Sequence, residues 1–432
     1  RLFNKIPYFD ENVEISQYPD IPNNEFTRDE ILSMLAKEML DAAELLPASQ
    51  SEVGRIHKYI ALAYAAKIKL YQAYQQDETT HAVTSINKEL LREVVSLCDQ
   101  VTASNRYGLL DDFQGLDLVA NENGKESVFA IQYSMNDGTE SAGRINWSNL
   151  LNSPGGGSPY GGDGFFLPSQ DLINAYQTDA NGLPDFNYQS KSDYSWAVLN
   201  NGVYTLQNTT PNVDPRLDFV VGRPTITWKT YPDKPCEGWV RDKETYGYNC
   251  AKRFWVSPES SDMFNGWPWG ASQLNWQIIR YADILLWKAE ALIELNEGDG
   301  LETARDLINQ IRNRARNSAY VKDFNDHSKY AANYLVNPYP ADVWNQDYAR
   351  QALRWETRLE KALEGERFFD LVRWGIVETT MNKYITAESD NRIYYANAHF
   401  TGGKDEYYPV PNNQYGFSGG KYVQNPGYAP FN

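Results

Sequence analysis

Residues 275–318 read NWQIIRYADILLWKAEALIELNEGDGLETARDLINQIRNRARNS, and this stretch decides the fold. Apolar residues recur every three or four positions in its first part, which predicts a helix with one buried face. These residues are Ile278, Ala282, Leu285, Leu286, Ala289, Leu292 and Ile293. The sequence EGDG at 297–300 interrupts the pattern, and a second helical pattern follows at once. Its apolar residues are Ala304, Leu307, Ile308, Ile311 and Ala315. So short a connection predicts an antiparallel helical hairpin.

A second pair of helical patterns begins at Tyr348. The apolar positions of its first helix are Ala352, Leu353, Leu359 and Leu363. Those of its second helix are Phe368, Phe369, Leu371, Val372 and Trp374, and Gly375 ends the pattern. Two helical hairpins in tandem indicate an α-solenoid of the tetratricopeptide type.

The N-terminal part is predicted to contain helices of the same kind. Thr27 and Glu30 have the spacing of a capping box, and the helix that they open ends before Pro47. A partner helix rich in Ala and Tyr is expected at 55–74. A third helix is expected at 87–104, with its own partner upstream of residue 1.

Helical periodicity mostly stops between residues 107 and 273, where Gly, Pro, Asn and aromatic residues become frequent. We expect a strand at 126–133 and a short helix at 168–175. A hairpin is expected at 198–219, with residues 214–216 (DPR) as its turn. We interpret this segment as the ligand-facing part of the molecule.

The whole chain, 1–432, is therefore expected to be one mainly α domain with a large irregular insertion that contains short strands. Helical hairpins occupy 27–105 and tetratricopeptide-like hairpins occupy 275–378. The loop-rich, ligand-facing insertion lies between them at 107–273. Residues 392–432 are rich in Tyr, Pro and Gly, and we expect them to form an extended, non-helical strap over the helices.

Composition narrows the classes of function. The chain has 40 basic and 57 acidic residues and a formal charge of −17, which repels phosphate backbones and anionic lipid headgroups, so nucleic acid is not an expected partner. It contains 30 Tyr, 12 Trp and 17 Phe residues. Rings with one polar tip suit wet, concave binding surfaces. No run of 18 apolar residues is present, so no transmembrane helix is predicted.

Aromatic residues of the insertion are the candidate ligand contacts. Trp267 and Trp269 flank Pro268, whose ring stiffens the peptide and is expected to hold both indoles at the surface. Flat, exposed rings complement the C–H face of a pyranose or furanose. Four further rings are candidates: Tyr160, Trp147, Trp239 and Trp255. Candidate partners for sugar hydroxyls are Asn265, Asp262, Asp163 and Arg144. Each of these tryptophans has the alternative of a place in the core, as expected for Trp287, Trp355 and Trp374.

Motifs for other chemistry are weak. Cys236 and Cys250 either form one disulfide or stay as thiols. The segment 179–185 begins like a calcium loop, but Leu183 occupies a ligand position and no Glu closes it, so no metal site is predicted. The motifs HExxH and GxGxxG do not occur. A pair of carboxylates for glycoside hydrolysis stays open, because sequence does not give the separations that decide.

Several motifs, in order along the chain, resemble those of the SusD/RagB family. They are GFFLPSQDLINAY at 164–176 with DPR at 214–216, IRYAD at 279–283 with KAEA at 288–291, EGERFFDLVRWG at 364–375, YYPVP at 407–411 and QNPGY at 424–428. Two positions depart from the pattern. Thr357 stands where the family usually has Arg, and Lys361 stands where it has an apolar residue.

The resemblance implies a non-enzymatic protein without cofactors that binds oligosaccharide or polysaccharide. Family members are lipid-anchored on the extracellular face of a Gram-negative outer membrane, over a SusC-like TonB-dependent transporter. The start at Arg1 resembles a point inside family members, so we expect a longer precursor that also holds an export signal, the lipid anchor and another helical hairpin. Two alternatives stay open: an α-helical glycosidase or lyase, and a solenoid that binds peptides or proteins.

Overall fold

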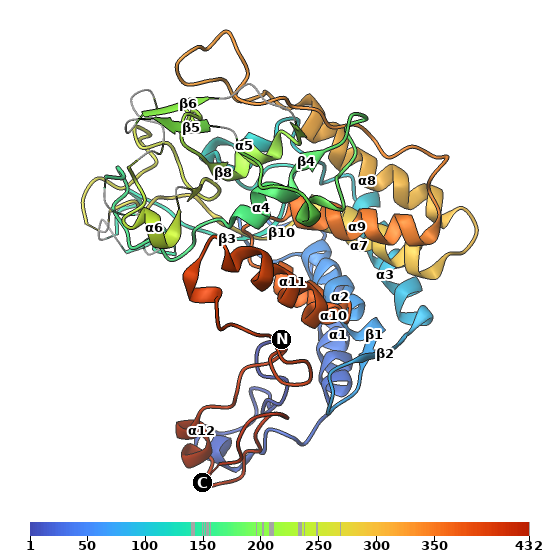
Figure 1. Cartoon of the computed structure of the whole chain (residues 1–432). Coiled ribbons are helices and arrows are strands. Elements are labelled where there is room, and N and C mark those ends of the chain that lie inside the picture. The colour runs from blue at the N-terminus through green and yellow to red at the C-terminus, as the bar shows by residue number, and fades with distance from the viewer. Residues whose placement is uncertain are drawn as a thin grey trace.

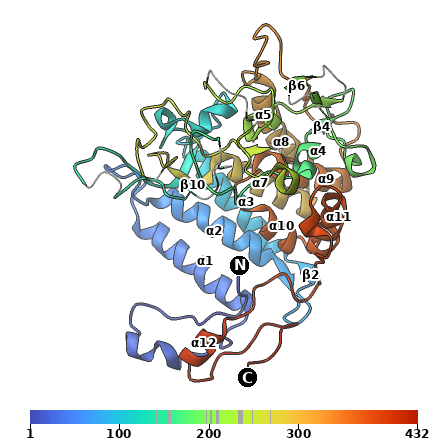
Figure 2. The ribbon, with the colours of Figure 1, turned by 60° about the vertical axis from the view of Figure 1, so that its left-hand side comes forward.

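The molecule is mainly helical, as predicted (Figure 1). The computed structural model of the chain describes residues 1–139, 143–148, 150, 152, 155, 157–195, 197–200, 203–206, 211–231, 236, 238–247, 249–267 and 269–431. Helices form one side of the molecule, and the irregular segments of the insertion cover the other side (Figures 1 and 2). Among the helices in these ranges, none combines the length and the apolar character that crossing a bilayer requires.

Three long helices form the N-terminal part: α1 (Arg28–Leu45), α2 (Lys58–Ala73) and α3 (Lys88–Ala103). The predicted capping box opens α1. The amide of Glu30 donates to the hydroxyl of Thr27 at 3.3 Å, and the amide of Thr27 donates to the carboxylate of Glu30 at 2.8 Å. Asn87 caps α3 in a similar way through its side-chain oxygen.

The helices of the predicted C-terminal hairpins are present as α7 (Tyr281–Leu295), α8 (Gly300–Asn317), α9 (Gln346–Glu360) and α10 (Arg367–Arg373). Helix α7 packs on α8 as expected, whereas α9 packs mainly on α7 and α8 and not on α10. One boundary was wrong. Residues Trp276–Arg280 form strand β10, because their backbone pairs in antiparallel fashion with β3 (Ser127–Ile131), the strand expected near 126–133. Helix α11 (Val377–Ser389) was not predicted.

The helices pack in one continuous series. Helix α1 packs on α2, α2 on α3, α3 on α7, and α7 on both α8 and α9. Helix α3 therefore has partners inside the chain on both sides, whereas the sequence suggested a partner upstream of residue 1. Its apolar face joins a core that includes Leu70, Leu91, Ile284 and Trp287. The contact between α3 and α7 joins the N-terminal helices to the C-terminal helices.

The insertion consists of short elements. Its strand pairs are β4 (Gln177–Thr178) with β7 (Asn212–Val213), β5 (Ala197–Asn200) with β6 (Val203–Leu206), and β8 (Val221–Gly222) with β9 (Cys250–Ala251). Its α-helices are α4 (Gln170–Ala175), α5 (Arg216–Val220) and α6 (Lys243–Tyr246). Two further strands, β1 (Tyr74–Gln76) and β2 (Val83–Ile86), join α2 to α3. The 3-10 helices of the chain are Ile15–Asp20, Phe113–Asp117, Val119–Asn121, Tyr188–Ser190 and Ile393–Tyr395.

The predicted hairpin of the insertion is only partly right. Strands β5 and β6 pair within the expected range, but Asp214, Pro215 and Arg216 are not their turn. These residues open α5, because the carboxylate of Asp214 accepts the amide hydrogen bond of Arg216 at 3.0 Å. The expected short helix at 168–175 is present as α4.

The two ends of the chain lie side by side (Figures 1 and 2). The side-chain amide of Asn425 donates to the carbonyls of Phe3 and Tyr408, both at 2.7 Å. Asn23 exchanges two hydrogen bonds with the backbone of Val423. The C-terminal segment contains the short helix α12 (Asn412–Phe417) as well as the 3-10 helix at Ile393–Tyr395, and the prediction of a non-helical strap excluded both.

Buried ion pairs connect the helices to the insertion. Arg280, at the start of α7, contacts the carboxylates of Glu126, Glu360 and Glu364 at 2.7, 3.0 and 2.7 Å. Within the part of the chain that the structure describes, the contacts continue through seven cations and seven anions, so the charges balance. The members are Lys229, Arg216, Arg253, Arg280, Arg312, Arg314, Lys361, Asp117, Glu126, Asp214, Asp283, Glu356, Glu360 and Glu364. We call this set the Arg280 network.

The network also accounts for one position that departs from the family pattern. The ammonium of Lys361 contacts Asp283 at 2.7 Å and Glu364 at 2.5 Å, so its buried charge is paired. At the other position, Thr357, the hydroxyl donates to the carbonyl of Leu353 one turn earlier on α9, at 2.9 Å. Both polar residues are therefore satisfied inside the helical layer.

The substitution Leu285→Ala should lower the free energy of unfolding by about 2–5 kcal/mol, because it leaves a cavity between packed helices. Leu45→Ala is the matched control, since Leu45 is 88% exposed at the end of α1 and should change stability by less than about 0.5 kcal/mol. Urea unfolding followed by circular dichroism measures both. Equal effects would contradict the placement of the core.

Glu360→Gln should destabilise the protein by about 3–5 kcal/mol at neutral pH, because it leaves buried guanidinium groups without their partner. Burial raises the pKa of Glu360, but Arg314, Arg280 and Arg216 outweigh it and lower this pKa to about 2 from its usual 4.5. The native carboxylate therefore contributes stability above pH 4.5 that is lost as the pH falls toward 2.

Unfolding free energies between pH 2 and 7 test this, and the Gln variant should show a flatter pH profile than the native protein. Glu89→Gln is the control, because its ion pair with Arg92 is exposed and should contribute at most about 1 kcal/mol. If the two variants behaved alike, the network would not be a main source of stability.

Candidate functional site

Two of the predicted tryptophans lie near the tip of a β-like hairpin formed by residues 262–273. The amide of Phe264 donates to the carbonyl of Ala271 at 2.8 Å, and the amide of Gln273 donates to the carbonyl of Asp262 at 3.1 Å. Trp267 and Trp269 are 69% and 52% exposed. Pro268, which we expected to stiffen this tip, lies outside the described residues.

A third exposed tryptophan comes from the neighbouring segment. Asn146 pairs with Ser272 of the hairpin, donating its amide hydrogen to the Ser272 carbonyl at 2.7 Å. Its side chain also donates to the carbonyl of Leu274 at 3.0 Å. Trp147 follows directly and is 47% exposed. Adjoining backbone segments thus carry the three exposed rings, Trp147, Trp267 and Trp269, which we call the tryptophan surface.

The other predicted rings, Tyr160, Trp239 and Trp255, are buried, which corrects their assignment as ligand contacts. With Trp228 they form a compact aromatic cluster. The hydroxyl of Tyr160 donates to the carbonyl of Val256 at 2.7 Å, and the indole N–H of Trp228 donates to that hydroxyl at 2.9 Å. Because these rings are buried and the polar tips of Tyr160 and Trp228 are used inside the protein, the cluster supports the surface instead of forming it.

The hairpin stands directly on this cluster at Gly270. Its φ of +78° is a conformation that favours glycine. A Cβ at this position would lie 2.9 Å from the Tyr160 carbonyl oxygen and 3.0 Å from the Trp255 ring. Any other residue would therefore push the tip away from the cluster. The close approach fixes the base from which Trp267 and Trp269 project.

Most of the predicted polar contacts already have partners in the protein. The carboxylate of Asp262 accepts from Gln273 at 2.6 Å and from Ser260 at 3.0 Å. Arg144 forms an ion pair with Asp137 at 3.3 Å, and Asp163 forms one with Arg241 at 3.4 Å. Asn265 is exposed on the hairpin itself. Of the four, Asn265 and Asp262 belong to the same hairpin as two of the exposed tryptophans.

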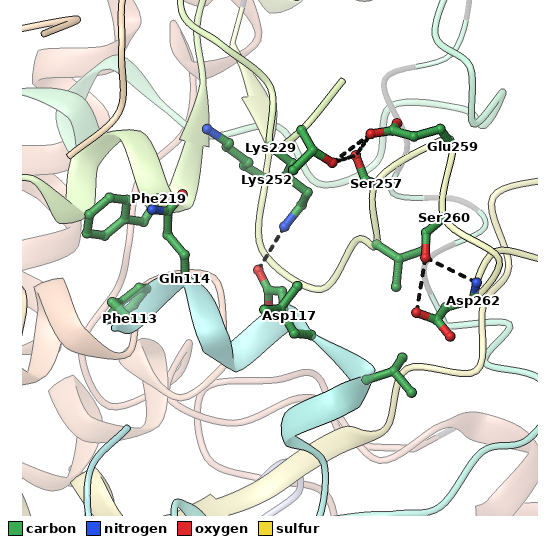
Figure 3. Close-up of a pocket in the computed structure, with 14 residues that line it drawn as sticks. Phe113, Gln114, Asp117, Phe219, Lys229, Lys252, Ser257, Glu259, Ser260 and Asp262 are labelled. Carbon is green, nitrogen blue, oxygen red and sulfur yellow. Dashed lines mark hydrogen bonds and ion pairs between the residues drawn. The ribbon is translucent and has the colours of Figure 1, made fainter. Parts of the chain in front are cut away.

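A cavity of about 440 Å³ opens at the base of the hairpin (Figure 3). Its lining combines apolar side chains, hydroxyls, two lysines and three carboxylates. The residues are Phe113, Gln114, Asp117, Leu118, Val119, Phe219, Lys229, Thr230, Lys252, Val256, Ser257, Glu259, Ser260 and Asp262. Only Asp262 was predicted, because the wall is assembled from four separate segments, each without a recognisable motif. We call this site the lysine cavity.

The remaining candidate motifs have structural explanations. Cys236 and Cys250 are free, buried thiols, and burial together with a hydrogen bond from the Cys250 thiol to Cys236 raises the pKa of Cys250 well above its usual value. The carboxylate of Asp179 accepts the amides of Asn181 and Leu183, as in an Asx turn. In the described ranges of the chain, no group of three or more His, Cys, Asp or Glu side chains is arranged to hold a metal ion.

The fold and this surface define a protein of helical hairpins that carries a loop-rich face with exposed aromatic rings. The family model of SusD matches residues 125–428, more than half of the chain, and the chain belongs to this family. The comparison with curated proteins gave no match.

Three solved structures illustrate the shared fold. A SusD superfamily protein from Bacteroides vulgatus is 20% identical, with a TM-score of 0.66 over 99% of this chain and 74% of that chain. A surface glycan-binding protein A from Bacteroides uniformis is 18% identical, with a TM-score of 0.61 over 98% and 73%. A laminarin binding SusD-like protein is 20% identical, with a TM-score of 0.56 over 99% and 75%.

Trp255→Ala should lower the free energy of unfolding by about 3–5 kcal/mol, because it empties the aromatic cluster. Trp269→Ala should leave stability within about 0.5 kcal/mol of the native value, because its ring is largely in solvent. Chemical denaturation of the two variants checks this difference. A loss of several kcal/mol in Trp269→Ala would show that the ring is a structural part of the hairpin.

Proposed function

We propose that this protein is a non-catalytic, cell-surface glycan-binding protein that captures oligosaccharide or polysaccharide. The observation that carries the proposal is the tryptophan surface: three exposed indoles on paired backbone segments, supported by a buried aromatic cluster. Membership of the SusD family supports it, as do the printed names of the laminarin-binding and surface glycan-binding neighbours.

Binding in this proposal combines stacking with a few hydrogen bonds. The apolar face of a sugar ring lies on an indole, and the exposed amide of Asn265 on the same hairpin bonds to hydroxyls. Because each contact is small and water competes for every hydroxyl, we expect micromolar to millimolar dissociation constants at one site. Several rings in a row then add up along a polymer.

Delivery is the second part of the proposal. We propose that the full-length precursor is lipid-anchored on the extracellular face of the outer membrane and passes its glycan to a SusC-like TonB-dependent transporter. The net charge of −17 supports contact with the membrane through an anchor, since the protein surface itself repels anionic headgroups. Affinity purification of the lipidated protein from its native membrane, followed by identification of the retained barrel, tests this partner.

The alternative function is that of a glycosidase or lyase. The lysine cavity is the place to consider for it, because the carboxylates of Glu259 and Asp262 both line this cavity. Burial raises the pKa of Glu259. Hydrogen bonds from the hydroxyls of Thr230 and Ser257 lower this pKa, and together with the backbone they outweigh burial, so the net shift is downward. A general acid needs a raised pKa. Release of reducing or unsaturated ends in proportion to added protein would overturn the non-catalytic proposal. Retention on no polysaccharide would favour a peptide-binding role.

Trp267→Ala and Trp269→Ala should each weaken retention on a bound polysaccharide by about 1–3 kcal/mol, which is the range for burying and stacking one large ring. Affinity electrophoresis in gels that contain the polysaccharide measures this, and melting temperatures confirm that the variants are folded. Phe417→Ala is the control, since it removes an exposed ring in α12 at the opposite end of the molecule. Unchanged retention in both tryptophan variants would refute the site.

A further inference from the structure

The lysine cavity contains a lysine in an unusual backbone conformation. Residues Trp228 to Tyr231 form a tight turn, in which the amide of Tyr231 donates to the carbonyl of Trp228 at 2.8 Å. Lys229 occupies the first central position with a φ of +48°, a conformation that glycine adopts most easily. Strain of this kind is commonly found where a side chain has a functional role. The side chain of Lys229 extends into the cavity toward Asp117 (Figure 3).

The ammonium group of Lys229 has donors to spare. Its one hydrogen-bond partner among the described residues is the carboxylate of Asp117, at 3.1 Å. Asp117 is itself shared, because it also accepts from Arg253 and from the amide of Phe254, both at 3.1 Å. An ammonium group has three N–H donors, so two remain for a ligand.

Lys252 adds positive charge to the same wall. Its ammonium donates to the carbonyls of Asp218 and Thr227 at 2.7 and 2.9 Å, and the described part of the chain gives it no carboxylate partner within ion-pair distance. Burial lowers the pKa of Lys252 to about 8 and also lowers that of Lys229. Both shifts have the sign expected where burial disfavours a charged ammonium group, and an anion bound beside it would oppose them.

The opposite wall consists of acceptors. Glu259 accepts the hydroxyls of Thr230 and Ser257 through one carboxylate oxygen, at 2.6 and 2.8 Å, which leaves its second oxygen for other donors. Asp262 lies on the same side, away from the lysines (Figure 3). The rings of Phe113 and Phe219 close the inner end. The cavity is therefore apolar at its base, has the lysine ammonium groups with Asp117 on one wall, and is rich in acceptors on the other.

We propose that the lysine cavity binds one hydroxylated carboxylate of the size of a hexuronic acid residue, with its carboxylate on the ammonium of Lys229 and its hydroxyls on Glu259 and Asp262. A volume of about 440 Å³ lies within the range of small-molecule sites. This inference extends the proposed function, because it gives the protein a second carbohydrate subsite that selects acidic sugars. The tryptophan surface, by contrast, stacks on any sugar ring of suitable shape.

The two walls together explain why other small molecules fit less well. A neutral sugar satisfies the acceptors but leaves the spare donors of Lys229 without an anion. A simple anion such as acetate reaches Lys229 but provides no hydroxyl donors for Glu259 and Asp262. Only a ligand with both groups uses both walls, and its binding should weaken as salt screens the charge.

Titration with glucuronate, glucose and acetate, followed by ligand-observed NMR at low salt, tests the proposal. The native protein should bind glucuronate at least tenfold more tightly than either of the other probes. Lys229→Met, which keeps most of the side-chain volume and removes the charge, should abolish this preference. Lys229→Gly should do the same while relieving the strained turn, so at least one of the two variants is expected to fold. Lys191→Met is the control, because Lys191 is exposed and paired with Asp185.

The outcomes separate this subsite from the proposed function. Equal affinity of the native protein for glucuronate and glucose, or native affinity in both Lys229 variants, would overturn the subsite. Those results would leave polysaccharide retention by Trp267 and Trp269 intact. Loss of retention on every polysaccharide would instead overturn the proposed function. Retention of a uronate-rich polymer that depends on both Lys229 and the tryptophans would support the two together.

Discussion

The charge-balanced Arg280 network is the interaction on which the rest of the structure depends. Arg280 is the last residue of β10, the strand that leads from the insertion into α7. The partners of Arg280 are Glu360 at the end of α9, Glu364 in the turn after α9, and Glu126 just before β3. Such a cluster is stable only when every member is paired, since a buried charge left alone is very costly. The insertion therefore has to meet the helices in one arrangement.

That constraint also fixes the position of the insertion in spite of its irregular backbone. Where the structure describes the insertion, its sheets have two strands each and its helices are short, so these elements alone hold little of the surface in place. Two anchors fix it instead: the aromatic cluster under Gly270 and the ion pairs that reach Asp117 through Arg253. The tryptophan surface lies over the aromatic cluster, and the lysine cavity opens beside Asp117.

The sequence predicted the parts of the fold that depend on local periodicity. The long helices α1, α2, α3, α7, α8 and α9 and the capping box at Thr27 follow from residue spacing alone, whereas α11 and α12 do not. The strand β10 did not, because its apolar residues also fit a helix and only the distant partner β3 decides between the two.

The candidate site was predictable only in part, for a similar reason. Aromatic content marked the region that carries the exposed tryptophans, but nothing local separates the exposed Trp269 from the buried Trp255. Burial depends on which segments fold over a ring, and those segments are distant in sequence. The lysine cavity was beyond prediction because Phe113, Lys229 and Glu259 meet only in three dimensions.

The pairing of the chain ends couples two segments that are more than 400 residues apart in sequence. Asn425 and Asn23 each hold backbone of the opposite end, so neither terminal segment can fray without releasing the other. Amide hydrogen exchange should then show both segments opening as one cooperative unit, with a shared free energy of opening. A protease that cuts within either end would likewise free both, leaving the helical layer and the binding face intact.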